Sequence, residues 1–189
     1  MGDVNQRLFL TRSMPKVDGA VLEVGSRDYG NTTSFRDVYA DSEYIGVDIA
    51  AGKNVDRVVD LAAGIGELAE NHFSLAICCS VLEHVRRPWE MAANLTRLLR
   101  RGGALYVAVP WVWRYHPYPD DYFRFSWRGI AELFPEIAWT RQAYSTNLND
   151  EFFDVGDGID NGLAKYVNAA TGQRKYLPYL QVHMFGVRS

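Results

Sequence analysis

The sequence predicts an α/β fold with a doubly wound, mostly parallel β-sheet. Short runs of apolar residues alternate along the chain with segments of helical spacing, which is the pattern of strand–helix–strand units. The runs are apolar at nearly every position, so they suit strands that are covered on both faces. The 189 residues contain no internal repeat and no linker, and they are predicted to form a single domain, residues 1–189.

Composition excludes several other classes of protein. Apolar residues make up 48% of the chain and charged residues 23%, an ordinary globular balance that no disordered or collagen-like chain has. No apolar run approaches the ~20 residues of a membrane span, and the first residues do not resemble a signal peptide. The net charge of -3 offers no electrostatic reason for a nucleic-acid partner. Cys78 and Cys79 are adjacent and are expected to be reduced. We therefore expect a cytoplasmic protein with neither a membrane nor a nucleic-acid partner.

Seven segments are predicted as strands because they are apolar and rich in β-branched residues. They are Ala20–Val24, Tyr44–Val47, Arg57–Val59, Leu75–Cys79, Ala104–Val109, Ile137–Ala143 and Leu180–Val187. Helical spacing predicts four helices, at Thr33–Tyr39, Ile65–Glu70, Pro88–Arg100 and Trp127–Phe134. Pro88 suits a first helical turn, and Gly102-Gly103 is expected to end that helix. Ser126 is the expected N-cap of the last helix, and Pro135 stops it.

A block of aromatic residues follows the fifth predicted strand. Residues 111–127, WVWRYHPYPDDYFRFSW, hold eight aromatic side chains interleaved with charged ones. Two interpretations are open: packing of a strand or lid, or a wall on which a sugar or aromatic acceptor stacks. We predict that this block lines or covers an acceptor pocket. The acidic, Gly-rich segment Asn147–Gly162 is predicted to be a loop.

The ends of the first two strands suggest a nucleoside-binding site, because ligands of doubly wound sheets bind beyond the carboxyl ends of the strands. The first strand runs into Gly25-Ser26-Arg27-Asp28-Tyr29-Gly30, and the second ends at Asp48, whose carboxylate can bind both ribose hydroxyls. A dinucleotide fingerprint has a glycine where Arg27 stands, so that the backbone can approach a pyrophosphate. An NAD-dependent oxidoreductase is therefore disfavoured. S-adenosylmethionine, which has no pyrophosphate, does not need that glycine.

The order of these segments resembles the class I S-adenosylmethionine-dependent methyltransferases over roughly residues 20–130. The matching segments are VLEVGS at 21–26, YIGVDIA at 44–50, VDLA at 59–62, CCSVLEHV at 78–85 and LRRGGALYVAVP at 99–110. One departure is that the family's common G-x-G-x-G loop reads GSRDYG here. Similar loops, and a block like HPYPDDYFRFS, occur in a subgroup linked to sugar, polysaccharide or secondary-metabolite modification.

The resemblance implies a Rossmann-like methyltransferase sheet, mostly parallel with an antiparallel last strand. It divides the chain into an N-terminal lead (1–19), a cofactor-binding core (20–110) and an acceptor-side segment with the last strands (111–189). S-adenosylmethionine is the implied cofactor, and nine residues are its implied contacts. Glu23 braces the loop, Gly25 lies under the cofactor, Asp48 binds the ribose, Asp60 meets the adenine amino group and Ser80 faces the methionine part. The remaining four are Ser26, Arg27, Ile49 and Leu61.

Methyl transfer to a hydroxyl requires the loss of a proton, and an imidazole can accept it at neutral pH. His116 and His84 follow predicted strands at the cofactor end, and either could be the base. We place the role on His116, with Asp120 or Asp121 orienting its ring, and leave open that no base is needed. Because the sequence shows neither a second Cys pair nor clustered His, we predict no metal ion, and we leave open that the carboxylates of Asp120 and Asp121 hold a divalent cation. The expected partner is a small-molecule acceptor, most simply a sugar or metabolite hydroxyl. A non-catalytic cofactor-binding module is the alternative.

Overall fold

The computed structural model describes residues 3–30, 34–155 and 179–189. Within these residues a single sheet has the strand order β3-β2-β1-β4-β5-β8-β6-β7. The strands are β1 (Ala20–Val24), β2 (Tyr44–Asp48), β3 (Arg57–Val58), β4 (Phe73–Cys79), β5 (Leu99–Val112), β6 (Ile137–Ser145), β7 (Phe152–Asp154) and β8 (Leu180–Arg188). The helices are α1 (Asp3–Ser13), the 3-10 turn η1 (Leu82–His84), α2 (Pro88–Leu98) and α3 (Trp127–Leu133).

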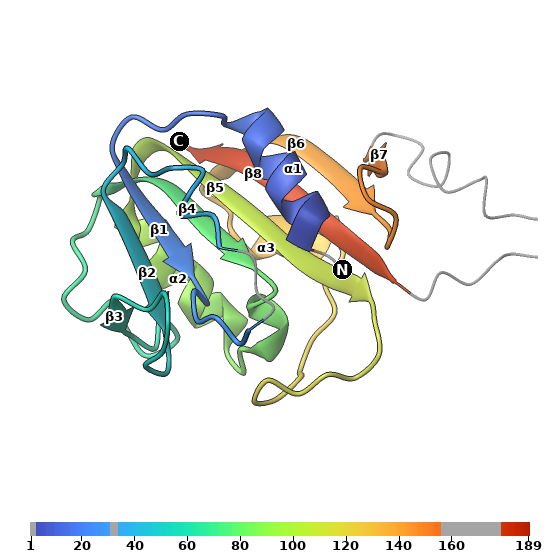
Figure 1. Cartoon of the computed structure of the whole chain (residues 1–189), viewed down its shortest axis with the longest axis horizontal. Coiled ribbons are helices and arrows are strands. Elements are labelled where there is room, and N and C mark those ends of the chain that lie inside the picture. Colours follow the sequence, from blue (N-terminus) through green and yellow to red (C-terminus); the bar gives the residue numbers. More distant parts are fainter. Residues whose placement is uncertain (1–2, 31–33, 156–178) are drawn as a thin grey trace, which may run out of the picture.

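The sheet confirms the predicted fold class. Strands β1 to β5 run parallel to one another, whereas β8 lies between β5 and β6 and is antiparallel to both. The short strand β7 pairs antiparallel with β6. In Figure 1 the strands β1, β2, β4 and β5 point toward the same edge of the sheet. The carboxyl ends of these parallel strands therefore form one edge, where a doubly wound fold binds its ligands.

Helices cover both faces of the sheet. Figure 1 shows α1 lying across β5 and β8 on the near face, with α2 and α3 behind the sheet. On the α2–α3 side, Leu95 and Ile130 belong to a core that includes residues of β1, β4 and β5. On the other side, Phe9, Leu10 and Tyr39 belong to a second core against the same strands. The two cores explain why the central strands are apolar at nearly every position.

Two predicted helices are wrong. The described part of Thr33–Tyr39, from residue 34 onward, forms a bend and turns, and Ile65–Glu70 also forms turns. Gly66 has a φ of +58°, in the left-handed region, which interrupts any right-handed helix there. The apolar spacing reflects burial in each segment, since Tyr39 is 2% exposed and Leu68 is 4% exposed.

Helix α1 lies in the segment that the sequence analysis treats as an N-terminal lead. Its buried face carries two amides as well as Phe9 and Leu10, so a search for apolar periodicity misses it. The Asn5 side chain donates to the carbonyl oxygens of Thr146 and Leu148, at 3.2 and 2.9 Å. These bonds satisfy a buried polar group and connect α1 to the end of β6.

Helices α2 and α3 agree better with the predictions made from the sequence. Helix α2 begins at Pro88 as expected, but it ends at Leu98, and Gly102 and Gly103 lie inside β5 rather than at a helix end. Ser126 caps α3, because its side chain accepts a hydrogen bond from Gly129 N at 3.2 Å. Strand β7 is a correction to the loop predicted for Asn147–Gly162, whose last residues, 156–162, lie outside the described part.

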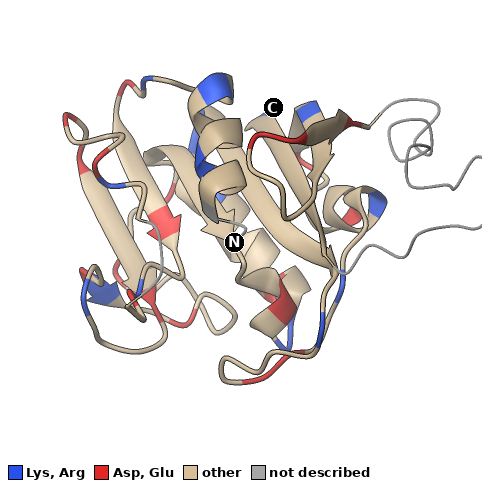
Figure 2. Cartoon of the chain, turned by 45° about the vertical axis from the view of Figure 1, so that its right-hand side comes forward, with Lys and Arg blue, Asp and Glu red and all other residues tan. Residues whose placement is uncertain are grey.

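Charged residues of both signs are interspersed over the visible side of the ribbon (Figure 2). None of the described helices is long and apolar enough to cross a membrane.

Candidate functional site

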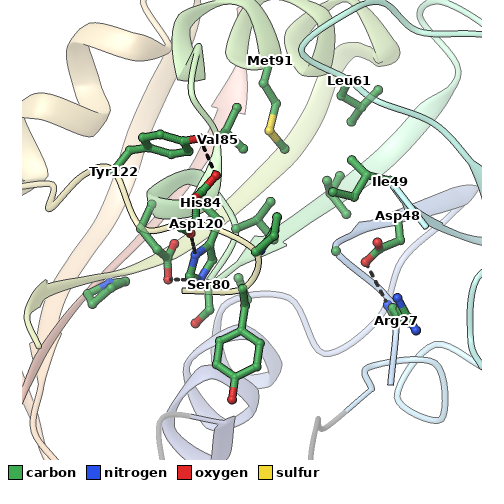
Figure 3. A pocket seen from close by; sticks show the side chains of 18 of the residues that line it. Arg27, Asp48, Ile49, Leu61, Ser80, His84, Val85, Met91, Asp120 and Tyr122 are labelled. Carbon is green, nitrogen blue, oxygen red and sulfur yellow. Dashed lines mark hydrogen bonds and ion pairs between the residues drawn. The ribbon is translucent and has the colours of Figure 1, made fainter. Parts of the chain in front are cut away.

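A cavity of about 1220 Å³ opens at the carboxyl ends of the parallel strands. Ordinary ligand pockets occupy about 300–1,000 Å³, so this one has room for a nucleoside-sized cofactor and a second molecule. Figure 3 shows its two sides: Arg27, Asp48 and Ile49 lie on one side, and His84, Asp120 and Tyr122 lie on the other. We refer to these as the cofactor side and the acceptor side.

Eight of the nine predicted cofactor residues line this cavity. They are Glu23, Gly25, Arg27, Asp48, Ile49, Asp60, Leu61 and Ser80. Ser26 does not line it: its side chain is buried against Gly46, and a Cβ at residue 46 would lie 2.7 Å from Ser26 Oγ. The fold thus brings together the ends of β1, β2, β3 and β4, which lie far apart in the sequence.

The loop after β1 requires glycine at residue 25. Gly25 has a φ of +72°, and a Cβ there would lie 2.3 Å from Val81 Cγ2. Both the backbone conformation and the packing exclude a larger residue. The resulting absence of a side chain leaves the backbone of the loop open to the cavity beside β4. Gly30 also has a positive φ, +95°, but a Cβ there would meet no atom of the described residues within 4 Å, so the reason visible for glycine at residue 30 is the backbone conformation alone.

Two carboxylates at the ends of β1 and β2 have different environments. Asp48 is 9% exposed, and its oxygens accept hydrogen bonds from Arg27 N at 3.4 Å and Ala50 N at 3.1 Å. These bonds hold the carboxylate at the rim of the cavity and leave further lone pairs for a ligand. Glu23 lies deeper and accepts from Tyr44 Oη at 2.8 Å. Burial raises the pKa of Glu23 to about 6, although the bond from Tyr44 opposes the shift.

The acceptor side contains the two predicted histidines in direct contact. The rings of His84 and His116 meet edge to face with centroids 4.8 Å apart. His84 Nδ1 lies 2.6 Å from the carbonyl oxygen of Asp120, and His116 Nδ1 lies 3.1 Å from Asp121 Oδ2. Both Nδ1 atoms therefore face hydrogen-bond acceptors, and the Nε2 atom of each ring points away from that acceptor.

Asp121 is a supporting residue and does not line the cavity. Its side chain is 1% exposed and forms an ion pair with both terminal nitrogens of Arg124. The Arg124 guanidinium, followed by the backbone N–H of His116, holds the pKa of Asp121 well below its usual range. Asp120 lines the cavity but uses its backbone carbonyl on His84, while its carboxylate accepts from Tyr122 Oη at 2.8 Å. The sequence predicts that Asp120 or Asp121 orients the ring of His116. In the structure the Asp121 carboxylate contacts His116, whereas the Asp120 backbone carbonyl contacts His84.

Glu83 is the residue that the sequence analysis misses. Its side chain is 0% exposed, and Oε1 lies 3.7 Å from His84 Nε2 and 3.8 Å from His116 Nε2. Neither carboxylate oxygen has a hydrogen-bond partner within the described part of the chain. The Glu83 carboxylate, followed by that of Asp121, raises the pKa of His116, and burial opposes the rise. Only the fold, which joins η1 to the aromatic block, could have identified Glu83.

The aromatic block forms part of the acceptor side, as the sequence suggests. Its lining members are Trp113, His116, Tyr118, Pro119, Asp120 and Tyr122. Tyr118 also meets Tyr29 of the cofactor loop edge to face, at a centroid distance of 6.1 Å. This contact joins the two sides of the cavity. Gln6 of α1 and Gln181 of β8 complete the wall and come from segments to which the sequence analysis assigns no site residue.

A family model described as a methyltransferase domain matches residues 2–151. The chain belongs to this methyltransferase family. The match covers most of the sheet and both sides of the cavity. The protein is thus a class I methyltransferase domain that uses S-adenosylmethionine as its methyl donor.

Solved structures share the fold of this methyltransferase at low sequence identity. YcgJ from Bacillus subtilis has a TM-score of 0.63 at 13% identity, over 97% of both chains. A second similar structure is the geranyl diphosphate C-methyltransferase of Streptomyces coelicolor in complex with Mg²⁺, geranyl diphosphate and S-adenosyl-L-homocysteine. Its TM-score is 0.65 at 11% sequence identity, and the alignment covers 98% of this chain and 77% of that chain. The phosphoethanolamine N-methyltransferase 2 of Haemonchus contortus has a TM-score of 0.59 at 14% sequence identity, and the alignment covers 97% of this chain and 52% of that chain. No curated protein matches the sequence.

The residues of the cofactor side fit S-adenosylmethionine. Gly25 leaves the loop backbone accessible, Asp48 has free acceptor capacity for a diol, and the cavity has volume for a second molecule. Arg27 lies where a dinucleotide-binding loop needs glycine. Its side chain packs against Gly52, since a Cβ added at residue 52 would lie within 3 Å of Arg27 Nε and Cγ. The same geometry therefore suits an adenosyl group better than a pyrophosphate.

Proposed function

We propose that this methyltransferase transfers a methyl group to a hydroxyl of a small molecule, either a sugar or a secondary metabolite. The observation that carries the proposal is that one cavity holds a nucleoside-binding edge and, facing it, two histidines with an aromatic wall. The volume of about 1220 Å³ supports simultaneous binding of the methyl donor and an acceptor.

On the cofactor side, each residue has a separable task. Asp48 binds the ribose hydroxyls, Asp60 and Leu61 contact the adenine, and Glu23 holds the loop from beneath through Tyr44. Ser80, whose hydroxyl accepts from Gln6 Nε2 at 3.0 Å, faces the methionine part. When bound, S-adenosylmethionine supplies an electrophilic methyl group on a sulfonium. The protein then contributes mainly by holding an acceptor atom in line with that methyl group and by excluding water.

On the acceptor side, we assign the proton acceptor to His116. Asp121, held ionised by Arg124, accepts a hydrogen bond and so keeps the proton of a neutral imidazole on Nδ1. The lone pair of Nε2 is then directed away from Asp121 and is available to a hydroxyl proton. Glu83 and Asp121 stabilise the imidazolium that results, as their effect on the His116 pKa indicates.

A hydroxyl acceptor of the sugar or metabolite class agrees with the wall of this side. Trp113, Tyr118 and Tyr122 offer apolar ring faces, and Asp120 and Gln181 add polar groups beside them. Sugars bind to such mixed surfaces through ring stacking and a few hydrogen bonds. Two proteins of the same fold are named for methylating small molecules, geranyl diphosphate and phosphoethanolamine, at carbon and nitrogen. The atom that accepts the methyl group is thus the part of the proposal that needs the most direct test.

The experiment is a screen of a metabolite pool with isotopically labelled S-adenosylmethionine, followed by kinetics on His116→Ala. We expect a labelled O-methyl product and a fall in kcat of about 10²–10⁴-fold in the variant, the usual contribution of a positioned base, with S-adenosylhomocysteine affinity unchanged. His72→Ala is the matched control, because His72 lies on the surface beside Glu43 and should retain full activity.

Other outcomes would change the proposal. A labelled N-methyl or C-methyl product would overturn the hydroxyl assignment. Cofactor binding without turnover, over a broad acceptor pool, would identify a binding module instead. Normal kcat in His116→Ala with loss in His84→Ala would move the base to His84.

A further inference from the structure

The cluster Glu83, His84 and His116 has the ligand chemistry of a metal centre. One ligand atom from each residue lies within 4.8 Å of the other two. Two imidazole nitrogens and one carboxylate oxygen are the donor set of many zinc and non-haem iron sites, whereas Mg²⁺ and Ca²⁺ prefer oxygen ligands alone. The sequence predicts no metal because His84 and His116 lie far apart along the chain, but η1 and the loop after β5 bring them into contact.

Both imidazole rings are oriented as metal ligands usually are. A metal-bound histidine typically donates its other N–H to a carbonyl or carboxylate, which fixes the tautomer and the direction of the ring. His84 Nδ1 has a carbonyl acceptor 2.6 Å away, and His116 Nδ1 has the Asp121 carboxylate at 3.1 Å. Neither acceptor can donate a proton, so the neutral rings carry hydrogen on Nδ1 and present the Nε2 lone pair. Both Nε2 atoms face Glu83 Oε1.

Glu83 supplies the independent reason for a cation. Its carboxylate is fully buried, and neither oxygen accepts a hydrogen bond within the described residues. A buried carboxylate without a partner costs several kcal/mol, so such groups in proteins are normally paired or bound to a metal. Two Nε2 atoms lie 3.7 and 3.8 Å from Oε1, and both bear lone pairs in the tautomers described above. A cation between these three atoms would satisfy all of them.

The spacing is compatible with a metal after a small side-chain movement. A tetrahedral zinc ion with bonds of about 2.0–2.1 Å separates its ligand atoms by about 3.3 Å. Two of the separations, 3.7 and 3.8 Å, exceed this by about half an ångström, and all three ligand atoms lie within 4.8 Å of one another, so rotation of the side chains is needed to close the site. All three residues line the cavity, so the remaining coordination position faces the acceptor side. Catalytic zinc sites keep such an open position, whereas structural sites do not.

We propose that Glu83, His84 and His116 form a binding site for one divalent transition-metal ion, of the zinc or iron(II) class, on the acceptor side of the cavity. A metal ion and a proton compete for the same Nε2 lone pairs. In the metal-bound protein His116 would act as a ligand and not as the base: a hydroxyl bound to the cation would lose its proton more readily, and that proton would pass to solvent water in the open cavity. This use of the ion rests on the proposed function, but its binding does not.

The direct test is metal titration of the full chain after dialysis against a chelator. We expect calorimetry with Zn²⁺ to give one ion per chain, and Co²⁺ to develop the visible absorption of a low-symmetry site at the same stoichiometry. Glu83→Gln, which keeps the side-chain shape, and His84→Gln should each weaken binding by about 100-fold or more. His72→Gln is the matched control, because His72 and Glu43 form a His–carboxylate pair on the surface, 3.2 Å apart. That variant should bind the ion as the wild type does.

A second variant separates ligation from folding. Asp121→Asn leaves the three ligands in place but weakens the acceptor that orients His116, so metal affinity should fall by about 10–100-fold. Thermal unfolding of the same samples without metal shows whether each variant is folded, and S-adenosylhomocysteine binding shows whether the cofactor side is intact.

The outcomes separate the metal site from methyl transfer. Less than about one tenth of an ion per chain in the wild type, or equal binding in the wild type, Glu83→Gln and His84→Gln, would overturn the site. Methyl transfer by metal-free protein with no metal binding would leave the proposed function standing and remove this inference. Stoichiometric metal binding without methyl transfer to any acceptor would do the reverse.

Discussion

Replacing Asp48 tests the cofactor side most directly. The carboxylate is 9% exposed and, within residues 3–30, 34–155 and 179–189, accepts two backbone hydrogen bonds, of which the one from Arg27 N is long at 3.4 Å. Its spare lone pairs can accept both hydroxyls of a ribose. Hydrogen bonds to a charged group are worth about 1.5–3 kcal/mol in total here, so Asp48→Ala should weaken S-adenosylmethionine binding by about 10–150-fold.

The assay is isothermal titration calorimetry with S-adenosylmethionine and with S-adenosylhomocysteine. Asp48→Asn retains one oxygen for Ala50 N and should lose less affinity than Asp48→Ala, because it removes the charge but not the shape. Asp41→Ala, at an exposed carboxylate before β2, is the control and should bind normally. Thermal unfolding must show all three variants folded. Affinity within about twofold of the wild type in folded Asp48→Ala would refute the ribose assignment.

Two further predictions concern stability and pH. Burial raises the pKa of Glu23 from 4.5 to about 6, so the wild type loses about 2 kcal/mol of stability in total as the pH rises from well below 4.5 to well above 6. The free energy of unfolding of Glu23→Gln, measured by urea denaturation, should increase relative to that of the wild type by this amount over the same range. A difference between the two proteins that stays constant with pH would contradict the prediction. His183 is buried between Tyr106 and Ser145, and burial lowers its pKa from 6.5 to about 3, so its contribution to stability is lost as pH falls below 6.5. The free energy of unfolding of His183→Gln should therefore rise relative to that of the wild type by on the order of 4 kcal/mol as the pH falls from 6.5 to 3. If both proteins lose stability equally in acid, His183 is already protonated in the folded protein.

The strands and the cofactor side were accessible to sequence reasoning because their signal is local. Val21 and Leu22 are fully buried in a run that is apolar except at Glu23, and Gly25 follows directly. Because the central strands are buried on both faces, their sequences are apolar at nearly every position, and this makes them recognisable. The helical predictions at 33–39 and 65–70 failed because a short apolar spacing records burial and not backbone conformation. Helix α1 was missed for the opposite reason, since two buried amides break the apolar pattern of a real helix.

The acceptor side depends on pairings between distant segments, which no local pattern records. The carbonyl oxygen of Glu83 accepts hydrogen bonds from the backbone N–H groups of Tyr122 and Phe123, at 2.8 and 3.2 Å, and these bonds dock the aromatic block on η1. The same docking places His84 against the carbonyl of Asp120 and brings His116 over the Glu83 carboxylate. One residue thus anchors the block through its backbone and supplies the buried charge at the centre of the cluster. A histidine can be recognised in the sequence as a candidate site residue. The carboxylate beside it, which decides whether its Nε2 binds a proton or a metal ion, can be identified only when the pairing of these two segments is known.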